Sequence, residues 1–166
     1  MSNLAFEAMK FAMEKHKGHQ RKYTNNPYTD HLAEVAGIVS SVERMSDVVF
    51  ACAWLHDVVE DRGVTPEELE ERFGKLVRLG VMALSDLEEG NRAQRKALSR
   101  DRLSKCSGWI QNIKVADLIS NTSSIVQHDP KFAVTYLEEK RLLLDVLTNA
   151  DPRLLEIARQ QIGEPS

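Results

Sequence analysis

The sequence has few of the features that mark secreted, membrane-spanning or nucleic-acid-binding proteins. No apolar run approaches the ~20 residues that a membrane span requires, and the opening segment MSNLAFEAMK has no apolar signal core. The net charge is -3, from 22 basic and 25 acidic side chains. This balance provides neither a basic surface for nucleic acid nor a polybasic segment for a membrane. We therefore expect no nucleic-acid partner and no membrane partner.

Cysteine is also scarce. Cys52 and Cys106 are the only two, and neither belongs to a CxxC pair, so we expect neither a zinc knuckle nor a redox motif. Cys52 lies within an apolar run and is predicted to be a core residue. Two free thiols without a signal segment predict a cytoplasmic protein.

The chain lacks a βαβ pattern, a clear alternating strand and a glycine-rich phosphate loop. Its dominant period is helical instead, and 166 residues suit one domain with one core. We see no linker and no internal repeat. The sequence therefore predicts an all-α fold, a single domain over residues 1–166 built as a bundle of roughly seven to nine helices.

Periodicity and capping residues predict where several helices lie. The first begins near Leu4 and stops near Lys17-Gly18, and the second begins near Asp30 after a polar, turn-rich stretch. A third, over about 47–59, is apolar nearly all round, which places it at the centre of the core. Asx-Pro or Thr-Pro helix starts stand at Thr65-Pro66, Asp129-Pro130 and Asp151-Pro152, with further helices over about 92–104 and 109–127.

The segment LHDVVED, residues 55–61, places one imidazole and three carboxylates at the end of an apolar helix. At about 100° per residue, all four side chains fall on one side of that helix end. Carboxylates so close repel each other and raise their own pKa values, which a divalent cation or a solvated exit into a loop would relieve. Acidic groups at a helix C-terminus oppose the macrodipole, which favours a functional reason over a merely polar helix end. The candidate residues are His56, Asp57, Glu60 and Asp61.

A metal site needs more ligands, and two residues elsewhere qualify. His31 begins the second predicted helix, beside Asp30, where a lone histidine is more often a cap or a surface residue than a ligand. Asp117 lies in an apolar helix, where a carboxylate is costly unless it caps the helix, pairs with Lys114 or binds a metal. Asn121, four residues on, shares its face. Two imidazoles and two carboxylates, from His31, His56, Asp57 and Asp117, suit Mn²⁺, Fe²⁺, Co²⁺, Ni²⁺ or Zn²⁺.

These residues in this order resemble the HD superfamily of metal-dependent phosphohydrolases. More narrowly, HDVVED at 56–61 and KVADLISN at 114–121 resemble the HDxxED and KxADxxxN motifs of the (p)ppGpp hydrolase domain in RelA/SpoT proteins. FAMEKHKGHQRK, followed by Pro27-Tyr28 and His31, resembles the first helices and the substrate loop of that family. The likeness covers about residues 4–147, and no synthetase region follows, so it is to the small alarmone hydrolases.

The resemblance implies metal-dependent hydrolysis of (p)ppGpp, with pyrophosphate and GDP or GTP as products. It implies that Glu60 and Asp61 position and deprotonate the attacking water. Arg21 and Lys22 would contact the nucleotide or its phosphates, Asn121 the ribose or a phosphate, and Tyr136 would line the pocket. Mn²⁺ would be held by His31, His56, Asp57 and Asp117.

Departures from the family pattern leave the substrate open. Leu32 and Arg62 stand where the family often has proline and threonine, and residues 84–107 have no clear match. The same site would also suit (p)ppApp, the 2′-phosphate of NADPH or a deoxynucleotide, and hydrolysis could serve as an antitoxin to an alarmone synthetase. Two other classes are a non-catalytic HD module that binds a nucleotide or a partner, and a purely structural helical protein. No heptad run indicates an oligomeric state.

Overall fold

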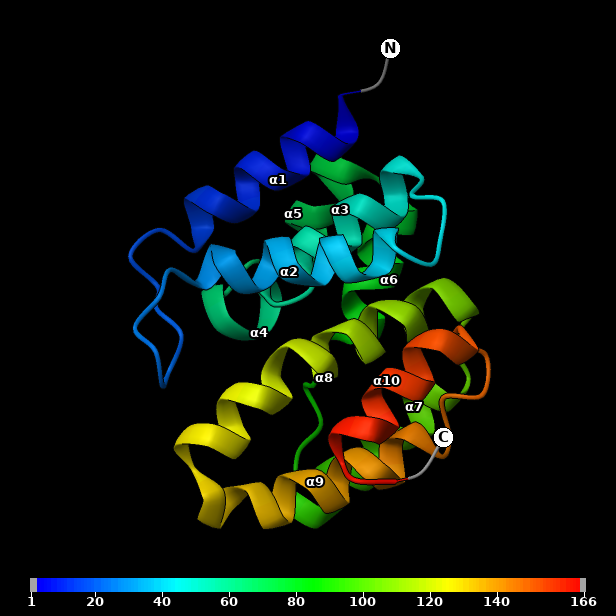
Figure 1. Ribbon diagram of the computed structural model, residues 1–166. Coiled ribbons are helices and arrows are strands. Elements are labelled where there is room, and N and C mark those ends of the chain that lie inside the picture. The colour runs from blue at the N-terminus through cyan, green and yellow to red at the C-terminus, as the bar shows by residue number, and fades with distance from the viewer. Residues whose placement is uncertain (1–2, 165–166) are drawn as a thin grey trace. The chain divides into compact units, whose positions relative to one another are not determined.

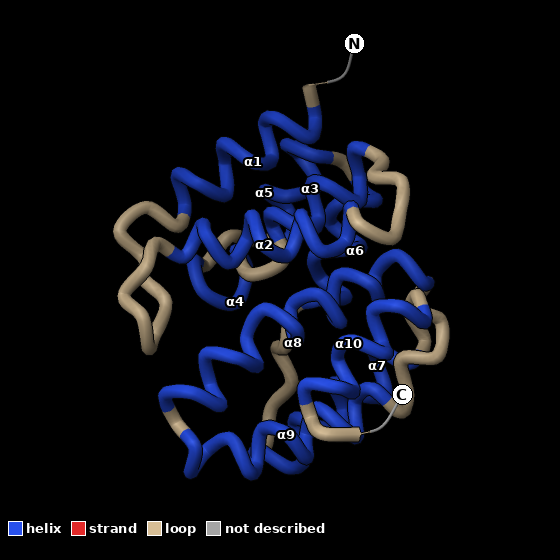
Figure 2. Tube along the Cα trace, in the orientation of Figure 1, coloured by secondary structure: helices blue, strands red, loops and turns tan. Residues whose placement is uncertain are grey.

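The computed structural model describes residues 3–164, and its regular structure there is helical (Figures 1 and 2). One isolated antiparallel bridge joins Gln20 and Pro27. The all-α prediction is therefore confirmed. The chain divides after Leu87 into two compact units, and the prediction of a single domain stays a prediction. None of the helices in the described part is both long and apolar enough to cross a membrane.

The first unit contains six helices, and α3 lies at the centre of its core. This helix packs against α1, α2 and α6, as its nearly continuous apolar surface predicts. Cys52 lies in the core, fully buried, as expected. Phe11 and Phe73 meet edge to face, with ring centroids 5.3 Å apart, and tie α1 to α5. The helices are α1 (Leu4–Lys15), α2 (Tyr28–Ser40), α3 (Asp47–Leu55), α4 (Val58–Arg62), α5 (Pro66–Phe73) and α6 (Lys75–Leu84).

The predicted third helix is wrong in one respect that matters for the site. The helix does not run on to Val59: α3 ends at Leu55, residues 56–57 form a turn, and α4 starts at Val58. The HDVVED side chains therefore do not share one helix end, and the angles expected from a single helix do not apply. This break, and a second one at Gly74 with φ of 88°, give ten helices in the described residues, one more than the range expected.

The second unit contains α7 (Arg92–Ser104), α8 (Gly108–His128), α9 (Pro130–Leu144) and α10 (Pro152–Gln161). The long helix α8 packs against α9 and α10, and α7 packs against α9. A Cβ atom added at Gly108 would lie 2.6 Å from the carbonyl oxygen of Asn149, so only glycine fits where α8 begins. Buried Gln111 extends this contact, because its Oε1 atom accepts from the Asn149 backbone N–H across 2.8 Å.

The predicted helix starts are confirmed, and their capping side chains explain them. Thr65 Oγ1 accepts from the backbone N–H of Glu68 across 3.2 Å at the start of α5. Asp129 and Asp151 cap α9 and α10 in the same way, with proline in the first turn of each helix. These short-range bonds satisfy N–H groups that the helix itself leaves without partners.

Candidate metal centre

Three candidate ligands come together in the first unit. His31 lies in the first turn of α2 and is fully buried, which excludes its interpretation as a surface residue. His56 is the C-cap of α3 and Asp57 the N-cap of α4, so both side chains leave the backbone at the turn between these helices. His56 is 2% exposed. The turn that interrupts the predicted helix is thus the element that aims His56 and Asp57 at α2.

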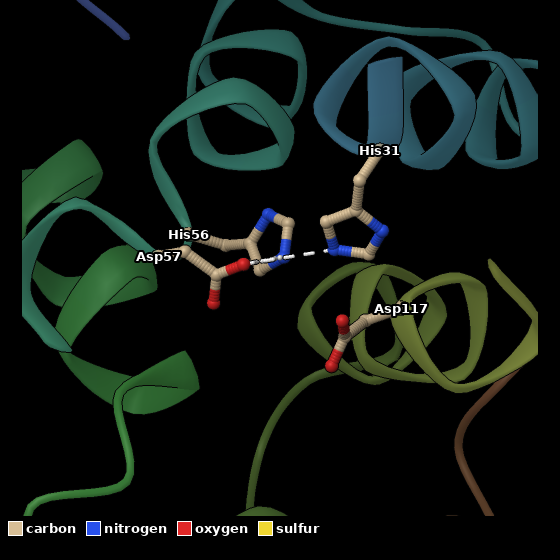
Figure 3. A group of neighbouring side chains, drawn as sticks. All are labelled: His31, His56, Asp57 and Asp117. Atoms are coloured by element: carbon tan, nitrogen blue, oxygen red, sulfur yellow. Dashed lines mark ion pairs between the residues drawn. The ribbon is translucent and has the colours of Figure 1, made fainter. Parts of the chain in front are cut away.

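The donor atoms of these three residues converge. His56 Nε2 lies 3.0 Å and His31 Nε2 3.6 Å from the Oδ2 atom of Asp57 (Figure 3). The two imidazole centroids are 5.4 Å apart. One ligand atom from each residue lies within 4.8 Å of the others, a spacing that suits a shared cation.

The tautomer of His56 determines whether its Nε2 atom can act as a metal ligand. Its Nδ1 atom lies 2.7 Å from the carbonyl oxygen of Ala53, and a carbonyl can only accept, so Nδ1 carries the proton. In the neutral ring, Nε2 then presents a lone pair toward the carboxylate of Asp57. Two acceptors at that distance repel each other unless a second proton or a cation lies between them. A backbone bond that fixes the tautomer in this way is typical of metal-binding histidines, so these residues fit a divalent metal.

An aromatic stack that the sequence did not predict adjoins Asp57. The hydroxyl of Tyr28 donates to Asp57 Oδ2 across 2.6 Å. The Tyr28 ring stacks on His19, with centroids 4.1 Å apart, and on His16, with centroids 4.9 Å apart. Burial lowers the pKa of His16 to about 4, so this ring is neutral. One signal was available in the sequence: Tyr28 precedes His31 by three residues, one turn of the same helix.

The two candidate catalytic carboxylates lie on the short helix α4. Glu60 accepts a hydrogen bond at Oε1 from the backbone N–H of Asp86, which holds its carboxylate in place. Partial burial raises the pKa of Asp61, and the charge of Asp57 raises it further, against the opposing charge of His19. A carboxylate with a raised pKa is a stronger base than one free in water.

Arg21 and Lys22 lie in the turn-rich segment between α1 and α2. The backbone N–H of Arg21 donates to the carbonyl of Asn26 across 2.8 Å, and Asn25 adopts a positive φ of 59° to close the turn. Arg21 is half-buried, whereas Lys22 is exposed, with its Nζ atom 5.2 Å from the centroid of the Tyr23 ring. The two side chains therefore differ in how freely they can approach an anion.

The fourth candidate ligand, Asp117, lies on α8 in the second unit and is buried. Lys114 Nζ contacts its Oδ2 atom across 2.9 Å, and Asn121 Nδ2 donates to its Oδ1 atom across 2.9 Å. The pairing with Lys114 that the sequence left open is therefore present. The predicted common face of Asp117 and Asn121 is confirmed by their hydrogen bond.

Tyr136, the last predicted site residue, lies on α9 in the same unit. Its hydroxyl oxygen is 3.4 Å from both Thr122 Oγ1 and the carbonyl oxygen of Leu118. Burial raises its pKa to about 12, so the phenol is neutral and able to donate a hydrogen bond at ordinary pH.

Comparisons with known proteins agree with this arrangement. The HD domain family model matches residues 8–127. A guanosine-3′,5′-bis(diphosphate) 3′-pyrophosphohydrolase, MESH1 of Xenopus tropicalis, is 36% identical over 130 residues, which cover 77% of this chain and 73% of that protein. MESH1 of Danio rerio is 34% identical over 127 residues, which cover 75% of this chain and 71% of that protein.

A solved structure shares the fold. It is that of a metazoan ortholog of SpoT described as hydrolysing ppGpp, and it matches with a TM-score of 0.87 and 26% identity over 97% of this chain and 94% of that one. The residues that this chain brings together at the end of α3 are the histidine-aspartate pair expected from its sequence. Since the family model covers well over half of the chain, the protein belongs to the HD domain family.

Proposed function

We propose that this protein is a metal-dependent phosphohydrolase that removes the 3′-pyrophosphate from (p)ppGpp and leaves GDP or GTP. The observation that carries the proposal is the convergence of His31, His56 and Asp57 in a chain of the HD domain family. Similar relatives named as guanosine-3′,5′-bis(diphosphate) 3′-pyrophosphohydrolases support the choice of substrate. The proposal makes the chain a single-domain cytoplasmic enzyme whose ligand is a small nucleotide.

The metal in this proposal is Mn²⁺, held by His31, His56, Asp57 and Asp117. A bound divalent cation of this kind polarises a phosphoryl oxygen and lowers the pKa of water. The hydrogen bond from His56 Nδ1 to Ala53 keeps the Nε2 lone pair available as a ligand. The bonds from Lys114 and Asn121 fix both oxygens of Asp117 in one orientation. A mixed nitrogen and oxygen donor set supports Mn²⁺ among several transition metals.

The carboxylates of α4 would handle the proton of the attacking water. Glu60, held by the backbone N–H of Asp86, orients the water, and Asp61 takes its proton. The partial burial of Asp61 disfavours its charged form and so raises its pKa, which supports this division of roles, because a base works best when its pKa approaches the working pH.

The remaining predicted residues would bind the nucleotide. Arg21 and Lys22 offer positive charge to phosphate oxygens, and the exposed position of Lys22 leaves its ammonium group accessible to an anion. Asn121 and Tyr136 offer an amide and a phenol hydroxyl to the ribose or to a phosphate. Both are neutral hydrogen-bonding groups, so they would contribute orientation and selectivity more than charge.

The test is an assay of metal-stripped protein with and without Mn²⁺ against ppGpp, ppApp, NADPH and dATP, with products resolved by ion-exchange chromatography. We expect Mn²⁺-dependent release of pyrophosphate from ppGpp that is lost in Asp57→Asn. The matched control is Asp30→Asn, which removes an exposed carboxylate one residue before His31. Turnover of a different nucleotide would support the assignment as an enzyme and contradict the proposed substrate. If folded, metal-loaded protein hydrolyses none of these nucleotides, the proposed catalytic function is wrong and a binding role replaces it.

A further inference from the structure

We propose that Tyr28 is a positioning residue of the metal centre, and that its hydroxyl holds the Asp57 carboxylate in the orientation that binds the metal. The inference rests on the proposed function for its metal, but it concerns Tyr28, which is not one of the proposed metal ligands. It follows from three features of the first unit: the bond to Asp57, the oxygen atom that this bond selects, and the stack that fixes the tyrosine ring.

The Tyr28 hydroxyl engages the carboxylate oxygen that matters for the metal. It donates to Asp57 Oδ2 across 2.6 Å, a short distance typical of a hydroxyl bound to a charged carboxylate. The same Oδ2 atom lies 3.0 Å from His56 Nε2 and 3.6 Å from His31 Nε2. The hydroxyl therefore holds the one oxygen of Asp57 that faces both imidazoles.

Asp57 needs such support because of its place in the chain. It is the N-cap of α4, but its side chain accepts no capping hydrogen bond there, so the start of this helix does not orient the carboxylate. A carboxylate that rotates about its side-chain bonds would present either oxygen, or neither, to a metal. A phenol hydroxyl prevents this rotation without adding a positive charge next to the cation, which an ammonium or guanidinium group would do.

The tyrosine ring is itself held in place. The backbone N–H of Tyr28 donates to the carbonyl of His19 across 2.9 Å, which sets the two residues side by side. Their rings stack with centroids 4.1 Å apart and an interplanar angle of 14°. His16, which is 1% exposed, stacks on the tyrosine as well, at 4.9 Å and 15°. The turn between α1 and α2 thus anchors a hydroxyl whose target lies 29 residues further along the chain.

The experiment is a calorimetric titration of metal-stripped protein with Mn²⁺, combined with steady-state hydrolysis of ppGpp. Tyr28→Phe keeps the stacked ring and removes only the hydroxyl. Tyr23→Phe, in the same turn-rich segment, is the matched control. Loss of a group that supports a metal ligand typically weakens metal binding about 10- to 100-fold. We expect a weakening of that size for Tyr28→Phe with a fall in kcat and little change in KM, and no change for Tyr23→Phe.

A purely structural tyrosine would lower the thermal stability of the metal-free protein and leave its Mn²⁺ affinity unchanged. An affinity of Tyr28→Phe within twofold of the unsubstituted protein overturns the proposal, as does a failure of the unsubstituted protein to bind Mn²⁺. If Tyr28→Phe loses its helical circular dichroism, His19→Leu replaces it: weaker Mn²⁺ binding supports the proposal and unchanged binding overturns it. If the unsubstituted protein binds Mn²⁺ but hydrolyses no nucleotide, the proposed function fails while the titration still decides the role of Tyr28.

Discussion

Lys140 donates from its buried Nζ atom to Thr122 Oγ1 across 2.7 Å, and its second acceptor, Gln161 Oε1, lies at 2.6 Å. Both of these partners are neutral, although the residue is only 1% exposed. Burial accordingly lowers the pKa of Lys140 from 10.5 to about 7. The bonds join α9 to α8 and to the last residue of α10, so the protonation state of Lys140 affects the contact among three helices.

The lowered pKa of Lys140 predicts a stability that rises with pH. Between about pH 7 and 10.5 the unfolded chain holds a proton on this lysine that the folded chain has released. The free energy of unfolding therefore increases across this window, and the destabilisation is fully present below about pH 7. Urea denaturation at several pH values should show this increase. Lys140→Met should flatten it, whereas Lys131→Met, an exposed site on the same helix, should not; equal slopes in both variants would contradict the prediction.

A methyl group at Gly108 should destabilise the second unit. The Cβ atom of Gly108→Ala would lie 2.6 Å from the backbone oxygen of Asn149, and a backbone atom cannot move aside cheaply. We expect a loss of roughly 1–3 kcal/mol in the free energy of unfolding, as for other overpacked sites. Gly37→Ala is the matched control, because nothing lies within 4 Å of its Cβ position on α2. Alanine there should stabilise by about 0.5–1 kcal/mol, and equal effects of the two changes in urea denaturation would refute the steric argument.

Neutral replacements of the α4 carboxylates should separate catalysis from metal binding. Glu60→Gln and Asp61→Asn keep the shape of each side chain and remove its charge. Removing a general base typically slows a reaction about 10²- to 10⁴-fold, so kcat should fall by that order in Asp61→Asn. It should also fall in Glu60→Gln, because the water loses the carboxylate that orients it. Calorimetric titration with Mn²⁺ should give nearly unchanged affinity for both variants. A loss of Mn²⁺ binding in either one would instead make that carboxylate a metal ligand.

Metal removal should lower the stability of the protein. A ligand that binds only the folded state raises the free energy of unfolding by about 2.7 kcal/mol when its concentration is about 100 times its dissociation constant. We therefore expect saturating Mn²⁺ to raise the melting temperature of metal-stripped protein and a chelator to reverse the change. His56→Ala removes one of the proposed ligands and should melt at the same temperature with and without Mn²⁺. A shift that persists in this variant would locate the stabilising ion elsewhere.

Local patterns in the sequence predicted much of the fold. The capping residues Thr65, Asp129 and Asp151 each bind backbone groups two or three positions away, so the sequence alone indicates where α5, α9 and α10 start. The helix expected over about 92–104 matches α7, and the apolar surface of α3 predicted its central place. The same local rules predicted the turn at His56 wrongly. Neither glycine nor proline marks that position, and the apolar period continues through it.

The residue types and their order, together with their resemblance to the HD superfamily, were enough to name the candidate ligands His31, His56 and Asp57. How these side chains meet depends on the tertiary structure. The approach of His56 to Asp57 and the tautomer fixed by the Ala53 carbonyl depend on a helix break. The hydrogen bond from Tyr28 to Asp57 joins residues 29 positions apart. The hydrophobic period of a sequence indicates only which residues are neighbours within a turn or two of helix. A contact between residues that are far apart in the sequence forms only when the helices pack around α3 and bring the two chain segments together.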